Sequence, residues 1–335
     1  MFGPYAAYAT TPRHATRACG LRVTYPRYLM LPKVGVNFQP DSMARSACAD
    51  IAALRRSGWE PEVIDAHYFY PDGVAAAIVC EELNLPLVIT ARGSDVNVLA
   101  HMPGHAKRVL WAADRAAAII AVSSRLKDGL VGLGVSDSKI SVLRNGVDLR
   151  IFWPVERVAA RREFQLAEGP LAICVGHLLP EKGYELAIQT LHHLEGFRLI
   201  FAGEGPKRPE LDALARRLGV DNRIVHLPSM PQERLRDLYS AADVTLLTST
   251  REGWPNVVLE SMACGTPVVA VDVGAVTDMV RECGFRAAVT TAPGAASMRS
   301  DRYQLPRFAP WDRTRLRYGF RLLANLQRRP ERVAA

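Results

Sequence analysis

The sequence predicts an α/β protein with two open parallel sheets in tandem and helices on both faces of each sheet. Two observations support this class. Short runs rich in β-branched residues alternate with helical patterns, and the alternation occurs twice, on either side of a charged stretch. Such alternation is typical of βαβ units. A length of 335 residues fits two domains.

The first series of elements falls within residues 1–150, which we predict to form one domain. A helix over 42–57 is expected to begin with Asp41 as its cap. A strand is expected over 21–26 and none before it. The alternating segments follow as strands over 62–65, 87–90, 118–122 and 140–143, separated by helices over 73–83, 106–117 and 124–133.

Residues 151–169 are charged, hold Pro154 and are predicted to form an irregular linker. A second domain is predicted over 170–300 and a basic helical tail over 301–335. Ligands of open parallel sheets bind where the strands end, so the loops of this domain are candidate sites. Its strands are expected over 171–175, 198–202, 223–226, 244–247 and 267–271, with helices after Gly183 and over 209–218, 232–241 and 256–264.

The composition limits the class of protein. Hydrophobic residues make up 49% and charged residues 23%, which are globular proportions and exclude a disordered chain. No apolar run is long enough to span a bilayer, and the N-terminal region lacks the pattern of a signal peptide. The six cysteines form no C-x-x-C pair, which argues against a zinc site or disulfide framework and favours a cytoplasmic protein.

Nearly all the net charge of +8 lies at the end of the chain, where residues 296–335 hold ten arginines against three acidic residues. A solvated helix is the simplest interpretation of this tail. A peripheral contact with the inner face of an anionic membrane is an alternative. Because the tail lacks the interleaved aromatic residues of a strand-binding groove, we expect no nucleic-acid partner.

The segment over residues 251–260 carries the strongest chemical signal. It follows a buried strand and opens a helix, so its amides suit a phosphate group. Glu252 lies in the loop and Glu260 early in the helix. Each could accept hydrogen bonds from sugar hydroxyls at opposite ends of a long diphosphate ligand. Two ordinary surface glutamates would give the same spacing, and that alternative stays open.

Two further loops of the second domain follow strands. The loop over 176–183 has glycine at both ends for close backbone approach, and Lys182 within it can neutralise a diphosphate. The segment 203–206 resembles the start of a dinucleotide fingerprint, but Arg208 stands where the third glycine belongs. No Walker-type lysine loop occurs, so dehydrogenase and P-loop functions are disfavoured.

Four residues of the first domain lie at or near strand ends. His67 follows the first strand, where a lone histidine more often has a structural role. Arg92 could hold an anion or pair with Asp95, and Asn145 lies in a turn that closes the domain. No Ser–His–Asp order and no cluster of metal ligands is visible, so we expect neither a metal nor a cofactor.

Taken together, these loops resemble family 4 of the glycosyltransferases, whose members have the GT-B fold of two Rossmann-like domains. The resemblance covers roughly residues 60–285, and its stretches follow the order of the family. The matching stretches are residues 67–73, 90–95, 121–123, 144–148, 176–183, 203–205 and 262–269, together with the E-x7-E of Glu252 and Glu260.

The resemblance implies transfer of a sugar from a nucleotide-sugar donor to a saccharide or lipid-linked acceptor, with retention of configuration and without a metal. Polysaccharide biosynthesis is the setting it suggests. His67, Lys182 and Glu252 would be catalytic: Lys182 would bind the diphosphate, Glu252 the sugar hydroxyls, and His67 would approach the sugar from across the cleft. Glu260 would hold the ribose, and the leaving phosphate would take the acceptor proton. Other donor contacts would come from Gly176, His177, Gly253, Trp254, Pro255, Asn256 and Val257, and contacts to acceptor or phosphate from Arg92, Asp95 and Asn145.

Three departures from the family pattern predict a chain shortened at the N-terminus and near the C-terminus. Residues 1–20 show no leading strand with a glycine loop, His177 stands where arginine is common, and the stretch after Phe285 is short. A neutral histidine removes one clamp from the diphosphate. Two alternatives to an active enzyme therefore stay open: a catalytically silent relative that binds nucleotide, and a basic protein that binds nucleic acid or a membrane.

Overall fold

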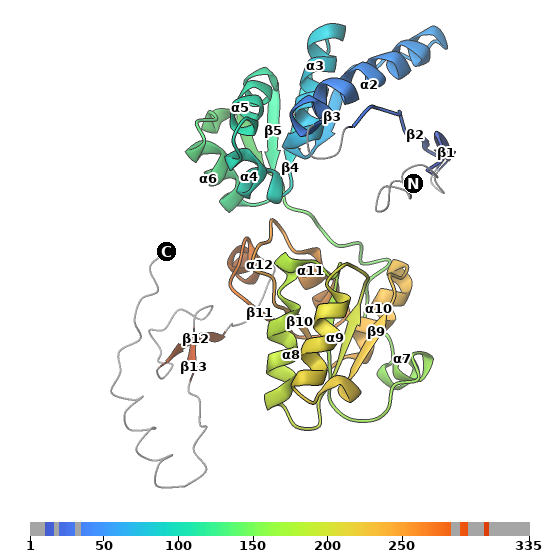
Figure 1. Ribbon diagram of the computed structural model, residues 1–335, viewed down its shortest axis with the longest axis vertical. Coiled ribbons are helices and arrows are strands. Elements are labelled where there is room, and N and C mark those ends of the chain that lie inside the picture. Colours follow the sequence, from blue (N-terminus) through green and yellow to red (C-terminus); the bar gives the residue numbers. More distant parts are fainter. Residues whose placement is uncertain (1–10, 17–19, 31–34, 283–288, 294–304, 308–335) are drawn as a thin grey trace. The chain divides into compact units, whose positions relative to one another are not determined.

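The computed structural model describes residues 11–16, 20–30, 35–282, 289–293 and 305–307 (Figure 1). The chain divides into two compact units, Met1–Gly274 and Ala275–Ala335. The first unit contains two parallel sheets whose strands alternate with helices along the chain, which confirms the predicted α/β class.

The first sheet has four parallel strands in the order β3-β4-β5-β6. Leu87, Ile89 and Ala91 of β4 are almost fully buried, as expected for an inner strand of a parallel sheet. The strands are β3 (Ile64–His67), β4 (Leu87–Ala91), β5 (Ala118–Ala121) and β6 (Ile140–Val142). The helices between them are α3 (Val74–Leu83), α4 (Ser94–Asn97), α5 (His105–Arg115) and α6 (Ser124–Gly132).

The helix before this sheet, α2 (Gln39–Arg56), begins earlier than predicted. Asp41 is not its cap: the residue before the helix is Phe38, and the Asp41 carboxylate pairs with Arg108 at 2.8 Å. Pro40 explains the early start, because proline fits the first turn of a helix without losing an internal hydrogen bond. The apolar side of α2 packs against α3.

A strand does occur where residues 21–26 predicted one, but its partner is unexpected. β2 (Arg22–Thr24) pairs antiparallel with β1 (His14–Thr16) and not with the parallel sheet. The expectation of no strand in the first 20 residues was therefore wrong. Among the described residues, β3 is an edge strand of its sheet.

The second sheet is parallel, with the order β11-β10-β7-β8-β9. From the central β7 the chain moves through β8 to β9 on one side, and then returns to β10 and β11 on the other. Strand order therefore reverses between β7 and β10, and a crevice opens at such a point. The strands are β7 (Leu171–Val175), β8 (Arg198–Ala202), β9 (Ile224–Leu227), β10 (Val244–Leu247) and β11 (Val268–Ala270).

Helices cover both faces of the second sheet, as predicted (Figure 1). Ala172 and Cys174 of β7 pack with α8 (Tyr184–His193) and α9 (Arg208–Arg217). Leu171 and Ile173, which point to the other face, pack with α10 (Gln232–Ala241). The helix that follows β10 is α11 (Asn256–Ala263).

The stretch predicted as an irregular linker contains a helix, α7 (Arg157–Glu163). The Glu156 carboxylate caps it by accepting the amides of Val158 and Ala159 at 2.8 and 2.7 Å. Arg161 donates to Asp243 at 2.8 Å, which holds α7 against the second sheet.

The second unit contains α12 (Val276–Glu282) and a parallel pair of short strands, β12 (Val289–Pro293) and β13 (Leu305–Arg307). Apart from β13, the predicted basic tail lies outside the described residues. No helix in the described part of the chain is long and apolar enough to cross a membrane.

Candidate functional site

The loops that follow β7 and β10 meet at the switch point of the second sheet. The Thr248 hydroxyl donates to the carbonyl of Lys182 at 2.9 Å, and the Thr250 amide donates to the carbonyl of Glu181 at 2.8 Å. Gly183 has a φ of +59°, and a Cβ there would lie 2.3 Å from the carbonyl oxygen of Thr248. The two loops touch through their backbones, so this position requires glycine.

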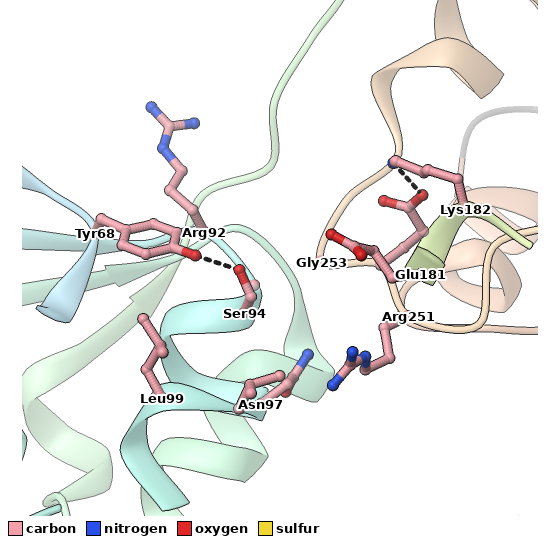
Figure 2. A pocket seen from close by; sticks show the side chains of 12 residues that line it. Tyr68, Arg92, Ser94, Asn97, Leu99, Glu181, Lys182, Arg251 and Gly253 are labelled. Carbon is pink, nitrogen blue, oxygen red and sulfur yellow. Dashed lines mark hydrogen bonds and ion pairs between the residues drawn. The ribbon is translucent and has the colours of Figure 1, made fainter. Parts of the chain in front are cut away.

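This contact brings two predicted site residues together. Lys182 Nζ lies 2.7 Å from Glu252 Oε1 (Figure 2), and the side chains are 27% and 11% exposed. The sequence assigned these groups to different parts of a ligand, whereas here each is the partner of the other. His177, from the same loop as Lys182, is exposed, with Nδ1 3.4 Å from the carbonyl of Glu204.

The start of α11 forms the next part of the site. Helix geometry leaves the first amides without internal acceptors, and Pro255 before them supplies no side-chain cap. The amides of Asn256 and Val257 therefore suit an anion. Further along the helix, Glu260 accepts a hydrogen bond from the Tyr239 hydroxyl at 2.9 Å, and burial raises the pKa of this glutamate.

Asn145 joins this helix to the first sheet. Its carbonyl accepts the indole N–H of the buried Trp254 at 2.9 Å. Its side chain donates to Asn256 Oδ1 at 3.3 Å and accepts from Arg92 Nη1 at 3.1 Å. Asn145 therefore connects the loop after β4 with the start of α11, a role that its position in a turn did not indicate.

The glycines over residues 203–205 have a packing role. Gly203 has a φ of +142°, and a Cβ there would lie 2.1 Å from the carbonyl oxygen of Gly176. A Cβ at Gly205 would lie 2.5 Å from the carbonyl oxygen of Leu178. These contacts fix the loop that carries Lys182, which explains glycine here without a dinucleotide ligand.

Asp95 supports the loop after β4 and has no exposed surface. Its carboxylate accepts the amides of Phe69 at 2.9 Å, Arg92 at 3.1 Å and Gly93 at 2.7 Å. Of the two alternatives for Arg92, an ion pair of its side chain with Asp95 does not occur among the described contacts, since Arg92 reaches this carboxylate through its backbone amide. Burial and three backbone partners also argue against Asp95 as a contact for an acceptor or phosphate.

Both ring nitrogens of His67 have partners. Nδ1 accepts from Arg92 Nε at 3.1 Å, so the proton lies on Nε2, which donates to Asp65 at 3.1 Å. His67 lines a mostly apolar cavity of about 360 Å³, formed by β3, α2 and α3. A direct contact with a donor sugar would therefore require its side chain to leave these partners.

A second cavity, of about 350 Å³, adjoins Lys182 and Glu252 (Figure 2). Tyr68, the residue after His67, lines this second cavity, and its hydroxyl is hydrogen-bonded to Ser94. Tyr68 has a φ of 86°, a strained conformation for a bulky residue and one often found at functional sites. Sequence reasoning missed this residue because only His67 was singled out where the predicted strand ends. It also missed Ser94, Asn97, Glu181 and Arg251, which line the same cavity.

The described residues contain no group of three or more histidine, cysteine, aspartate or glutamate side chains placed to hold a metal ion. The charged groups that line the cavity are three cations, Arg92, Lys182 and Arg251, and two carboxylates, Glu181 and Glu252. Hydroxyl and amide groups come from Tyr68, Ser94 and Asn97. Such a set can bind phosphate and hydroxyl groups of one ligand.

Two family models match successive parts of the chain. The model described as Glycosyltransferase Family 4 matches residues 6–151, and the model described as Glycosyl transferases group 1 matches residues 157–297. A putative teichuronic acid biosynthesis glycosyltransferase, TuaC of Bacillus subtilis, is 33% identical over 267 residues, or 78% of this chain and 65% of the relative. A D-inositol 3-phosphate glycosyltransferase of Acidothermus cellulolyticus is 34% identical over 258 residues, or 69% of this chain and 56% of the relative. The chain thus spans less than two thirds of either relative.

Solved structures share the fold. The structure of Anabaena Alr3699/HepE in complex with UDP has a TM-score of 0.61 at 24% identity. The matched region covers 69% of this chain and 65% of the Anabaena chain. Sucrose-phosphate synthase from Thermosynechococcus elongatus has a TM-score of 0.66 at 20% identity, and the matched region covers 81% of this chain and 70% of the synthase chain. Both agree with the expected arrangement of two Rossmann-like domains.

Proposed function

We propose that this chain, which belongs to family 4 of the glycosyltransferases, transfers a sugar from a nucleotide-sugar donor to a saccharide or lipid-linked acceptor with retention of configuration. One observation carries the proposal: Lys182, Glu252 and the start of α11 meet beside the switch point between β7 and β10. A cation, a carboxylate and unpaired helix amides at one crevice fit the phosphates and hydroxyls of a sugar nucleotide.

In the proposed reaction, the bond between the sugar C1 and the donor diphosphate breaks while the acceptor hydroxyl bonds to C1 on the same face. Lys182 leaves Glu252 and neutralises the departing diphosphate together with the amides of α11. Glu252 then accepts hydrogen bonds from sugar hydroxyls, and Glu260 accepts one from the ribose. The acceptor proton passes to an oxygen of the leaving phosphate, so the proposal requires no protein base, metal or cofactor.

Uridine diphosphate is the nucleotide that we propose for the donor. The support is indirect: structures of the similarly folded Anabaena protein contain UDP and UDP-glucose. His67 is proposed to act on the sugar side of the donor. The hydrogen bond from Arg92 holds its ring in the tautomer that carries the proton on Nε2.

The proposed setting is polysaccharide biosynthesis in the cytoplasm, at the inner face of a membrane. The Bacillus relative is named for teichuronic acid biosynthesis, and the ten arginines over residues 296–335 would be attracted to anionic lipids. Deletion of residues 312–335 is expected to abolish sedimentation with vesicles of phosphatidylglycerol. Unchanged sedimentation would contradict the membrane contact.

Calorimetric titration of the chain with UDP, GDP and ADP tests the donor site. Saturable binding of UDP, weakened at least tenfold in Lys182→Ala, is expected. UDP-sugars are then tested for transfer with Glu252→Gln as the inactive control. A folded chain that binds no nucleotide would contradict the proposal, and binding without transfer by any donor would identify a catalytically silent relative.

A further inference from the structure

The cavity of about 350 Å³ beside Lys182 contains a positive charge that the proposed donor contacts do not use. Its lining includes three cationic side chains. Two of them have partners on the protein: Lys182 pairs with Glu252, and the Arg92 guanidinium donates to His67 and Asn145. The third cation is therefore the one that a ligand can engage without first displacing a partner within the described part of the chain.

That third cation is Arg251, which is exposed. Within the described part of the chain its side chain makes no ion pair or hydrogen bond. Figure 2 shows it pointing away from Lys182 and toward the side of the cavity where Asn97 lies. Glu181 is a second carboxylate in the lining besides Glu252, and its charge adds, after burial and after Asp95 and Asp72, to the raised pKa of Tyr68 in the same cavity.

The wall opposite Arg251 is polar, and its charged side chain, Arg92, is hydrogen-bonded to His67 and Asn145. It contains the hydroxyl groups of Tyr68 and Ser94, which are hydrogen-bonded to each other, and Asn97 at the end of α4. Val98 and Leu99 continue this wall with apolar surface. Hydroxyl and amide groups next to apolar side chains suit a sugar ring, whose edge is polar and whose face is apolar.

We propose that this cavity binds the acceptor and that Arg251 selects an acceptor that carries an anionic group, a phosphate or a carboxylate. The inference rests on the proposed function and extends it to the class of acceptor. The planar guanidinium presents paired N–H donors that match two oxygens of either anion. Arg251 determines specificity and takes no part in the transfer step.

Two pairs of probes that differ in charge test the inference: D-inositol 3-phosphate against myo-inositol, and glucuronate against glucose. Binding to the full chain is measured by ligand-observed NMR titration, with and without saturating UDP. The charged member of at least one pair is expected to bind at least tenfold more tightly, and the responding pair distinguishes phosphate from carboxylate. Arg251→Gln is expected to reduce this preference below twofold, whereas Arg251→Lys retains part of it because the charge remains.

The affinity for UDP separates the inference from the proposed function. The affinity for UDP is expected to change less than twofold in Arg251→Gln. The control variant Arg216→Gln, which alters an exposed arginine of α9, should change neither the affinity for UDP nor the preference for charged probes. A tenfold loss of UDP affinity in Arg251→Gln would overturn the inference by assigning this residue to the donor. Equal binding of charged and neutral probes by the unaltered chain, or binding of none, would overturn it as well. If the chain preferred the charged probes but did not bind UDP, that result would contradict only the proposed function.

Discussion

The ion pair between Lys182 and Glu252 predicts that two substitutions at one contact will change UDP affinity in opposite directions. In the structure, Lys182 Nζ is engaged by Glu252 at 2.7 Å. A diphosphate must draw the ammonium away before it can use that charge. Glu252→Gln is therefore expected to tighten UDP binding, and Lys182→Gln to weaken it.

The magnitude follows from the geometry. At 2.7 Å and an effective dielectric constant of about 20, the attraction is roughly 6 kcal/mol. Most of this is offset by desolvation and by the exposure of Lys182, which leaves a net contribution of about 1 kcal/mol. Removing the charge of Glu252 should then tighten UDP binding about fivefold. Removing Lys182 forfeits a charge-assisted hydrogen bond to phosphate and should weaken UDP binding by about tenfold or more.

Calorimetry with UDP and UDP-glucose is the assay. Glu252→Gln should bind UDP more tightly yet lose preference for UDP-glucose, because the sugar hydroxyls lose a charged acceptor. Glu210→Gln is the matched control, since Glu210 of α9 pairs with Lys207, the residue before that helix, and the UDP affinity of this variant should stay within twofold. If Glu252→Gln and Lys182→Gln weakened UDP binding equally, the two groups would act as one binding unit, and the reasoning would be refuted.

Three further predictions concern stability, measured by urea unfolding. The Cβ added by Gly203→Ala would lie 2.1 Å from a carbonyl oxygen, so this variant should lower the free energy of unfolding by about 2–4 kcal/mol. The Cβ added by Gly132→Ala meets no atom within 4 Å, and this variant should raise the free energy of unfolding by about 0.5–1 kcal/mol. Equal changes in the two variants would contradict the close contact at Gly203. Asp95→Ala leaves three backbone amides without their acceptor and should lower the free energy of unfolding by about 3–5 kcal/mol. Asp137→Ala removes an exposed carboxylate from an ion pair and should lower the free energy of unfolding by about 0.5 kcal/mol or less. Burial lowers the pKa of His226 despite Asp212 at 2.8 Å. Below about pH 6.5 the unfolded chain therefore binds more protons at this site than the folded chain, and stability should fall as the pH drops through that value. His226→Gln should reduce this fall, and an unchanged pH dependence would count against burial as its cause.

The fold was predictable to the extent that it depends on local pattern. Buried parallel strands are continuous apolar runs, so β7, β8 and β10 were located at their observed bounds. The misses depend on distant contacts or weak local signals. β2 has the composition of a strand, but its partner β1 is chosen by tertiary structure. The helix α7 has seven residues and a glutamate cap, which is less common than serine or aspartate.

The site was predictable at the level of loops and less so at the level of side chains. Lys182, Glu252 and Glu260 were singled out because the chemistry of open parallel sheets gathers where strands end, and the structure brings Lys182 and Glu252 into contact. Their partners were not, since the direction of a side chain depends on what packs around it. Asp95 shows this most clearly: the sequence offers Arg92 as an ionic partner, but burial commits its carboxylate to backbone amides. Arg251 gave no signal, because an arginine in a loop is ordinary until the wall opposite it is known.

The contacts between loops explain how this site can exchange partners without losing its shape. Cβ atoms at Gly183, Gly203 and Gly253 would each lie 2.1–2.3 Å from a carbonyl oxygen of a neighbouring loop. The loops are therefore fixed through their backbones, independently of the charged side chains they carry. A preorganised backbone needs no rearrangement during the reaction. Donor binding then has only to replace the carboxylate partner of Lys182 with a phosphate, which is why we expect substitutions at the ion pair to alter affinity and substitutions at the glycines to alter folding.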